Sequence, residues 1–486
     1  MQQQELITGF DSPEGQFKLS RDLQLERTLG QRKCHLAFVT NKTSNPTAAS
    51  TGELDELGNQ PARYVEVPIS GDDKGTFSFV QKEKGKAKKV KSAIVKPSSS
   101  FVSKVVANEN LAKILSNRAN ETTYMLLNIG TSLGWMEYGG KSKDPLSTIY
   151  FRDATATCID INVLTKDNID TIIGFNTGDI LHYSPMTGKF VRINKQGCIN
   201  KAGVTSIKWM PPRGQGDDEN MFAAGFEDGS VIIFDKEKPD PPADFTPTFG
   251  NDDSLFAIMK PPKNPKSNPC GWWQAGRKFI TGIDEKQIAI ATSPDFQHIA
   301  IASADGHLHI VDYKLDCLVE TYRAYYGGIT CVDWSPDGKY ILTGGQDDIV
   351  TIWQFQRGIV ARCHGHSSWI SGVAFDPHLC TESSYRFASI GDDTRLFLWE
   401  FSLNQLTRPK PSIQRKYRQD NPHLTQEDGV YPVLSQKDVG TLAPIESEGF
   451  RLHNVPLCAL TFRDDALVTT DMLGLVRIWQ RPPNSI

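Results

Sequence analysis

Residues 329–353 read Ile329-Thr-Cys-Val-Asp-Trp-Ser-Pro-Asp-Gly-Lys-Tyr-Ile-Leu-Thr-Gly-Gly-Gln-Asp-Asp-Ile-Val-Thr-Ile-Trp353. Apolar residues alternate with polar ones near both ends of this stretch, as at Val350 and Ile352, which predicts pleated strands. The sequence Ser-Pro-Asp-Gly at 335–338 is typical of a tight turn, because proline fixes one φ angle and glycine tolerates a positive one. A second turn is predicted at 346–348. The stretch therefore predicts a small antiparallel sheet.

The same pattern recurs along the chain. Its turn prolines, Pro294, Pro336 and Pro377, are 42 and 41 residues apart. Looser copies are found over 158–183, 204–235, 457–479 and, around one turn, 124–138. A period of ~40–45 residues with a strand that ends in Trp is typical of WD repeats, which form four-stranded propeller blades. We therefore predict an all-β fold, a seven-bladed WD-repeat β-propeller with long disordered insertions.

We expect the propeller to span 121–482. Its repeats are predicted near 121–152, 155–195, 204–236, 279–314, 326–356, 366–402 and 453–482. Seven blades use roughly 300 residues. We assign many of the remaining residues to a Lys-rich disordered insertion at 74–120 and to two further insertions at 237–275 and 403–452. The last repeat supplies three strands, and an open ring would leave unpaired strand edges. The N-terminal extension, 1–73, should therefore contribute a closing strand, from 33–40 or 62–69.

Charge and composition exclude several classes of protein. The net charge is −4, and a nucleic-acid-binding protein usually has a basic excess, so no nucleic-acid partner is predicted. No apolar run reaches the ~18–20 residues of a membrane span, and the start, 1–5, lacks the features of a signal peptide. The nine cysteines include no C-x-x-C pair. They predict reduced thiols in a cytoplasmic protein, with nuclear import left open.

The segment 82–104 contains eight lysines. We interpret it as a solvated, disordered loop, and the alternative is a nuclear-localisation or polyanion-binding tract.

The chain contains no convincing catalytic motif. Gly139-Gly-Lys-Ser142 resembles the end of a phosphate-binding loop, but Trp135 stands where the first glycine of that motif is required. The histidine pairs 307/309 and 364/366 have no obvious third and fourth zinc ligands. We therefore predict no enzyme activity, no metal and no cofactor, and expect a binding platform.

One repeat contains the four residue types that tie a loop to its blade in WD repeats. His366 precedes the first strand, Ser389 is on the second, Asp393 is in the next turn and Trp399 is on the third. A buried indole N–H and a buried carboxylate each need a hydrogen-bond partner. We predict a structural tetrad of these four residues.

Aromatic residues gather in the loops that precede two neighbouring repeats, at 322–328 and 364–369. Tyr326 and Trp369, flanked by Gly and Ser, are candidates for an interface, because aromatic side chains give a large apolar contact at low entropic cost. Tyr325 stands at the tetrad His position and is expected to pack inside its loop. The predicted partner-binding residues are Tyr326, Trp369, Tyr325, Arg323 and Ser368.

Several motifs together resemble one family. They are Tyr326-Gly-Gly, Trp334-Ser-Pro-Asp-Gly-Lys-Tyr, Gly365-His-Ser-Ser-Trp and Tyr385-Arg-Phe-Ala-Ser-Ile-Gly-Asp-Asp-Thr. This set is similar to fungal catabolite-repression protein C and its animal relative, WD-repeat protein twenty. The resemblance covers roughly residues 120–482.

The resemblance implies a function. Members of that family bind and activate a ubiquitin-specific cysteine protease, often together with a second WD-repeat protein. The two aromatic residues that face the protease in the family correspond to Tyr326 and Trp369 of this chain. The family usually has Phe at the first of these positions. The function implied is a non-catalytic regulatory subunit that activates a deubiquitinase allosterically.

Other functions stay open at this point. A substrate receptor or scaffold subunit of a cullin ubiquitin ligase is the main alternative, although such receptors commonly carry W-D-x-R, whereas this chain has Trp353-Gln-Phe-Gln and Trp399-Glu-Phe-Ser. A propeller enzyme would need acidic or His residues at the channel mouth. A nucleic-acid scaffold would show strongly salt-dependent binding.

Overall fold

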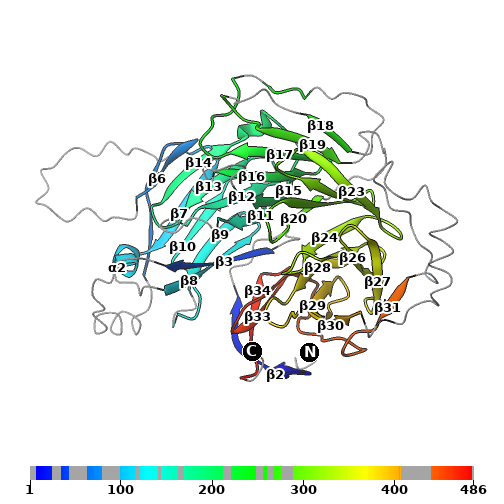
Figure 1. The fold of residues 1–486 in the computed structure, drawn as a ribbon. Helices are drawn as coiled ribbons and strands as arrows, with labels where there is room; N and C mark the ends of the chain where they lie inside the picture. Colours follow the sequence, from blue (N-terminus) through cyan, green and yellow to red (C-terminus); the bar gives the residue numbers. More distant parts are fainter. Residues whose placement is uncertain are drawn as a thin grey trace, which may run out of the picture.

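The fold is described by a computed structural model. It describes residues 7–24, 34–42, 63–78, 99–116, 121–140, 144–162, 169–211, 220–242, 244–247, 256–259, 266–275, 288–403, 406 and 439–483. These residues form seven sheets arranged around one axis, which confirms the predicted seven-bladed propeller (Figure 1). Strands within each blade pair antiparallel, and β31 is the one described strand that pairs in parallel.

The first three blades contain more than the usual four strands. Blade 1 consists of β3 (Cys34–Lys42), β8 (Glu121–Ile129), β9 (Ser132–Glu137), β10 (Ser147–Phe151), β7 (Val102–Asn108) and β4 (Tyr64–Glu66). Blade 2 consists of β11 (Ala156–Ile161), β12 (Thr171–Phe175), β13 (Ile180–Ser184), β14 (Lys189–Ile193), β6 (Lys74–Phe77) and β5 (Ile69–Ser70). Blade 3 consists of β15 (Val204–Trp209), β16 (Met221–Phe226), β17 (Ser230–Asp235), β19 (Gly271–Ala275) and β18 (Phe256–Met259).

The last four blades follow in chain order. Blade 4 consists of β20 (Ile288–Thr292), β21 (His298–Ser303), β22 (His307–Asp312) and β23 (Cys317–Arg323). Blade 5 consists of β24 (Ile329–Trp334), β25 (Tyr340–Gly345), β26 (Ile349–Gln354), β27 (Gly358–His364) and β31 (Gly440–Leu442). Blade 6 consists of β28 (Ile370–Phe375), β29 (Ser384–Gly391) and β30 (Leu396–Ser402). Blade 7 consists of β32 (Leu457–Phe462), β33 (Ala466–Asp471), β34 (Leu475–Gln480), β2 (Gly15–Gln24) and β1 (Gly9–Ser12).

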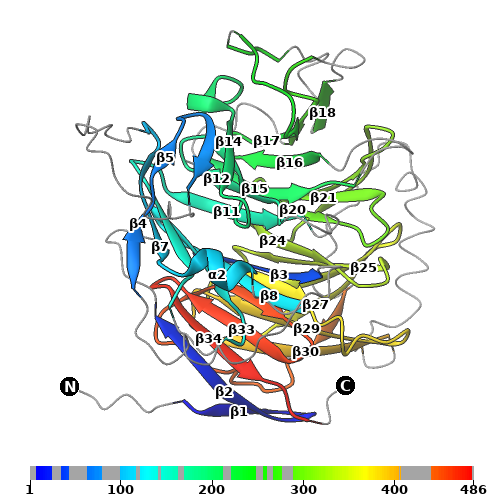
Figure 2. The same cartoon turned by 90° about the vertical axis from the view of Figure 1, so that its left-hand side faces the viewer.

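The closing strand comes from a different N-terminal segment than expected. Strand β2, residues 15–24, pairs with β34 and completes blade 7, and Figures 1 and 2 both place it beside that strand. The two predicted segments lie elsewhere: 34–42 is the innermost strand of blade 1, and 64–66 adds to the outer edge of the same blade. The expectation of 33–40 or 62–69 was therefore wrong. Strand β2 in blade 7 and strand β3 in blade 1 thus lie on the two sides of the seam between these blades.

Parts of the predicted insertions also form regular structure. Of 74–120, β6 adds to blade 2, β7 is an outer strand of blade 1, and α2 (Leu111–Ser116) follows it, while 79–98 and 117–120 lie outside the described residues. Within 237–275, β19 is the fourth strand of blade 3. Within 403–452, β31 extends blade 5, and Phe450 forms a bridge with Leu396 of blade 6. The local sequence of each of these segments gives little indication of the strand with which it pairs.

The innermost strands contact each other in a closed ring, β3–β11–β15–β20–β24–β28–β32 and back to β3. Near the start of five of these strands, a side chain donates a hydrogen bond to a carbonyl of the next blade. The donor–acceptor pairs are Thr157–Val204, Thr205–Ile288, Thr330–Ile370, Ser371–Leu457 and Cys458–Cys34. Asn128 donates across the seam from blade 1 to Ala156 at 2.8 Å. These bonds link the inner edges of neighbouring blades.

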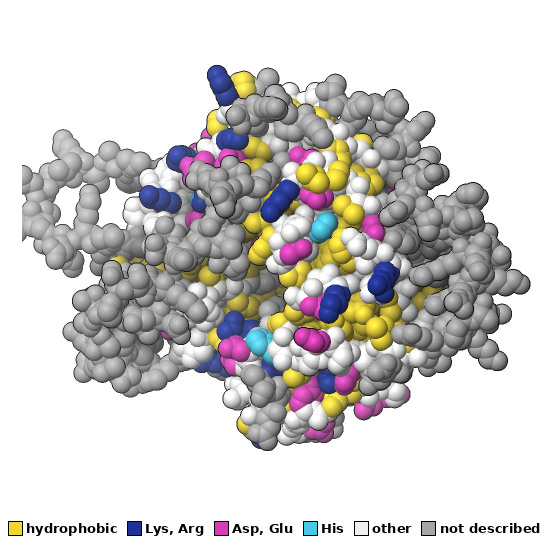
Figure 3. Space-filling view, viewed as in Figure 1, with side chains coloured by type: hydrophobic (Ala, Val, Ile, Leu, Met, Phe, Trp, Pro, Cys, Tyr) yellow, Lys and Arg dark blue, Asp and Glu magenta, His cyan; other side chains and the backbone are white. Residues whose placement is uncertain are grey.

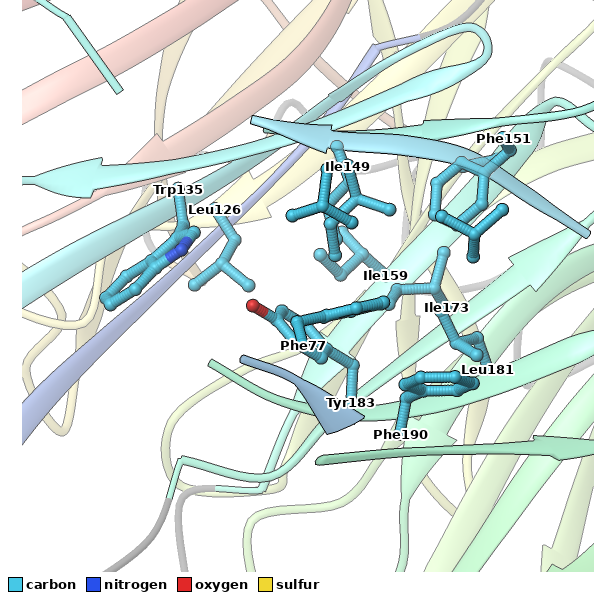
Figure 4. Close-up of a cluster of buried hydrophobic side chains, with 14 of the residues drawn as sticks. Phe77, Leu126, Trp135, Ile149, Phe151, Ile159, Ile173, Leu181, Tyr183 and Phe190 are labelled. Atoms are coloured by element: carbon cyan, nitrogen blue, oxygen red, sulfur yellow. The ribbon is translucent and has the colours of Figure 1, made fainter. Parts of the chain in front are cut away.

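Hydrophobic clusters fill the spaces between neighbouring blades. Figure 4 shows one of them, in which Leu126, Trp135 and Ile149 of blade 1 point toward Ile173 and Tyr183 of blade 2. Phe77 of β6 stacks on Phe190 of β14 with ring centroids 4.7 Å apart, so an N-terminal strand completes this core. Each sheet is thus buried on both faces by its neighbours. No helix among the described residues is long and apolar enough to cross a membrane.

The closing strand predicts a stability effect. Phe17 on β2 is buried and stacks on Phe10 at 4.9 Å, whereas Lys18 on the same strand is exposed. We expect Phe17→Ala to lower the free energy of unfolding by about 3–5 kcal/mol, because it leaves a cavity under the closed edge. Lys18→Ala should change it by less than about 0.5 kcal/mol. Urea unfolding followed by tryptophan fluorescence measures both, and equal small effects would show that β2 contributes nothing to closure.

Candidate partner-binding site

The four predicted tetrad residues lie together in blade 6. His366 Nδ1 is 2.9 Å from Asp393 Oδ2, and its Nε2 is 2.8 Å from Ser389 Oγ. Ser389 Oγ accepts a hydrogen bond from Trp399 Nε1 at 2.9 Å. Burial opposes ionisation of Asp393, but hydrogen bonds from His366 and from the backbone N–H of Ser367 and Arg395 bring its pKa below the ordinary value. The chain of bonds ties the loop before β28 to strands β29 and β30.

A second tetrad occurs in blade 7 and was missed in the sequence. His453 Nδ1 is 3.0 Å from Asp471 Oδ2, and its Nε2 is 2.8 Å from Thr469 Oγ1. Thr469 accepts from Trp479 Nε1 at 2.9 Å. The available signal was spacing, since the hydroxyl residue precedes its Trp by 10 positions in both tetrads. The histidine is harder to recognise because the segment between the first and second strands differs in length, so that His453 precedes Thr469 by 16 residues whereas His366 precedes Ser389 by 23.

The predicted interface residues lie in the two loops that precede β24 and β28. Tyr326 is 76% exposed and Trp369 is 52% exposed, and Arg323 at the end of β23 is also exposed. Ser368 is half-buried. Tyr325 is 46% exposed, so the expectation that it packs inside its loop was wrong. It lies against the Arg362 guanidinium, 4.4 Å from the ring centroid, and leaves its other side to solvent.

The same rim contains one further apolar residue that the sequence did not single out. Leu473, in the turn between β33 and β34, is 42% exposed. Turns between the second and third strands of a blade open on the same side of the propeller as the loops that precede the first strand. Leu473 in blade 7 therefore belongs to the same face as Tyr326 and Trp369. The sequence alone does not mark Leu473 as an interface residue, because single leucines are common at exposed positions.

The backbone of both loops is held in place. The loop before β28 is fixed by Ser367 N–H, which donates to Asp393, and by the carbonyl of Trp369, which accepts from Asp392 N–H at 2.9 Å. In the loop before β24, Gly327 has a φ of 67°, and the Gly328 N–H donates to Gln346 Oε1 at 3.0 Å. A Cβ on Gly328 would lie 2.6 Å from the Ala304 carbonyl oxygen, so this close approach requires glycine. Both loops thus present aromatic rings on a fixed backbone.

The axis of the ring contains a cavity of about 260 Å³, lined by the innermost strands. Lys208 Nζ is 3.2 Å from Asp160 Oδ1 there, and burial raises the pKa of nearby Asp333 to about 6. Within the described ranges, no three His, Cys, Asp or Glu side chains are grouped as metal ligands. On the face seen in Figure 3, basic and acidic side chains are interspersed among apolar ones.

Comparison with known proteins relates this chain to WD-repeat proteins. Residues 316–354 match the family described as WD domain, G-beta repeat. Over 421 residues the chain is 31% identical to the UBP9-binding protein bun62 of Schizosaccharomyces pombe, and the match covers 79% of this chain and 75% of that protein. A chain in the crystal structure of the mitotic checkpoint complex is 12% identical, with a TM-score of 0.48, covering 74% of this chain and 86% of that one.

The repeat that matches the family begins in one blade and ends in the next. Residues 316–354 contain β23, the outer strand of blade 4, and then β24, β25 and β26 of blade 5. The loop with Tyr325 and Tyr326 therefore lies inside one sequence repeat but between two blades. Its conformation depends on both blades.

The tetrad in blade 6 predicts a stability effect at its histidine. We expect His366→Ala to lower the free energy of unfolding by about 1–3 kcal/mol, because it leaves the Asp393 carboxylate and the Ser389 hydroxyl without that partner. His378→Ala is the matched control, because His378 is exposed and should change stability by less than about 0.5 kcal/mol. Urea titration of both variants provides the comparison. A loss in His366→Ala no larger than in the control would contradict a stabilising tetrad.

Proposed function

Because the chain belongs to the WD-repeat family of catabolite-repression protein C and WD-repeat protein twenty, we propose that it binds a ubiquitin-specific cysteine protease and activates it allosterically. The chain itself supplies no catalytic group in this proposal. The observation that carries it is the pair of exposed aromatic side chains, Tyr326 and Trp369, on fixed loops of neighbouring blades. The relative bun62, named for binding UBP9, supports the class of partner.

The exposure of these rings supports an interface role. Tyr326 is 76% exposed and Trp369 is 52% exposed, although aromatic side chains of this size gain most free energy when buried. Aromatic residues are enriched among the few positions that contribute most of the binding energy in protein interfaces. Their backbones are already ordered, so little further conformational entropy is lost when a partner covers them. Arg323, Tyr325 and Ser368 border the two rings in the proposed contact.

Activation requires more than binding. The propeller must bind the active arrangement of the protease more tightly than the resting one, and a tenfold shift corresponds to about 1.4 kcal/mol of difference. A rigid surface suits this task, because it can complement one arrangement of the protease and not the other.

A second WD-repeat protein in the complex is part of the proposal, because members of the family often act together with one. None of the nine cysteines forms a disulfide, which fits the proposed cytoplasmic location.

The proposal is tested by the paired substitution Tyr326→Ala and Trp369→Ala in the full-length chain. Affinity purification with mass spectrometry should recover a ubiquitin-specific protease with the wild type and at least about tenfold less with the double variant, because hot-spot truncation costs about 2 kcal/mol or more. Turnover of a fluorogenic ubiquitin substrate by the recovered protease should rise on addition of wild type and stay near its basal rate with the variant.

The matched control is Leu315→Ala, which removes an exposed apolar side chain (69% exposed) in the turn between β22 and β23, on the opposite side of the propeller. It should bind and activate like wild type. If the folded double variant still binds and activates fully, the assigned interface is wrong. Recovery of cullin adaptors in place of a protease would favour the ligase-subunit function.

A further inference from the structure

Blade 5 holds its aromatic loop by contacts that differ from those of blades 6 and 7. Trp353 Nε1 donates to Thr343 Oγ1 at 2.8 Å, as the corresponding Trp does in both tetrads. However, Tyr325 occupies the position of the tetrad histidine and points to the surface, where it is 46% exposed. In blades 6 and 7 a histidine links the loop to the blade. In blade 5 this link must therefore come from other residues.

Arg362 lies at the base of this loop. It belongs to β27, where its neighbours Ala361 and Cys363 are part of the core shared with blade 6, so its own side chain leaves the opposite face of the strand. Arg362 is 2% exposed, and its guanidinium lies 4.4 Å from the centre of the Tyr325 ring. A cation at this distance from a ring is attracted to its face, more strongly where water is excluded.

Asp347 completes the arrangement from the turn between β25 and β26. Burial raises the pKa of Asp347 to about 6, while the backbone N–H groups of Ile349 and Tyr326 and the charge of Arg362 favour its ionised form. Burial also lowers the pKa of Arg362, and Tyr325 and Asp347 oppose that change. The cation thus lies against the ring of one loop residue, and its charge favours the ionised form of a carboxyl group in the adjoining turn.

We propose that Arg362 is a positioning residue, which holds the Tyr325–Tyr326 loop in the conformation that the partner binds. This inference rests on the proposed function, because it concerns the same surface. Arg362 itself is buried and does not touch the partner. Its contribution to affinity comes from ordering the loop before binding, so that the cost of ordering Tyr326 is not incurred in the complex.

The proposal has a specific consequence for combined substitutions. If Arg362 acts through the Tyr326 loop, its loss should matter only while the Tyr326 ring is present. It should be independent of Trp369, whose loop is held by the tetrad of blade 6. A general loss of stability would instead affect both backgrounds equally. A double-mutant cycle separates these cases.

The test uses the full-length chain and the ubiquitin-specific protease recovered by the purification described above. Arg362→Met removes the charge at similar volume, and we expect the dissociation constant to rise about tenfold, while Arg362→Lys, which keeps a cation, should stay within about threefold. In the Tyr326→Ala background, Arg362→Met should add less than about twofold. In the Trp369→Ala background it should keep its full effect.

Two results would overturn the inference: unchanged affinity in Arg362→Met, or the same fold-loss in both backgrounds. Should Arg362→Met fail to fold, Arg362→Gln takes its place in the cycle, because it also removes the charge and changes no residue of the proposed contact. Failure of this inference is distinguishable from failure of the proposed function. If Tyr326→Ala and Trp369→Ala leave affinity unchanged, the interface itself is wrong; if they weaken binding and the cycle shows no coupling, only the role of Arg362 is wrong.

Discussion

Closure of the ring by β2 against β34 is the contact on which the rest of the structure depends. A propeller blade buries its faces only against its two neighbours, so an open ring would expose two faces and a strand edge. The N-terminal segment closes blade 7 with β2 and then forms the innermost strand of blade 1 with β3. Across the same seam, Cys458 donates to the Cys34 carbonyl at 3.3 Å. Strands from both ends of the chain are therefore joined at one seam.

The hydrogen bonds at the inner seams extend this closure around the ring. Thr157, Thr205, Thr330 and Ser371 each bond to a carbonyl of the following blade, so neighbouring blades are hydrogen-bonded to each other at these seams. The outer loops are held separately, by tetrads in blades 6 and 7. The seam bonds thus connect neighbouring blades at their inner edges, and the tetrads fix the rim of blades 6 and 7. A rigid rim allows exposed aromatic side chains to serve recognition without a large loss of entropy.

Neighbouring blades support their rim loops in different ways. In blade 6 the tetrad through His366 fixes the loop that carries Trp369. In blade 5 an aromatic residue replaces the histidine, and the loop lies against Arg362. With Tyr325 in place of histidine, a ring lies at the surface, and the proposed anchoring role passes to Arg362 on the fourth strand, β27. The degeneracy of WD repeats thus coincides, at this position, with the proposed binding surface.

Much of the architecture was predictable from local chemistry. Turn prolines at a constant period and strands that end in Trp353 and Trp399 indicate blades, because these patterns arise within one hairpin. The blade 6 tetrad was predictable for the same reason, and the aromatic rim followed from Tyr326 and Trp369 in adjacent repeats. The blade 7 tetrad was not, since His453 is separated from its partners by a loop of different length.

The sequence by itself determined the repeat, the blade count and the residues offered at the rim, because each depends on neighbours a few positions away. Only the tertiary structure decided which N-terminal segment closes the ring, where β19 and β31 pair, and that Arg362 lies beneath Tyr325. Edge strands of similar composition can pair with several partners, and the choice among them depends on which edge the closed ring leaves open. A contact between residues 37 positions apart, such as Tyr325 with Arg362, exists only once two blades are packed together.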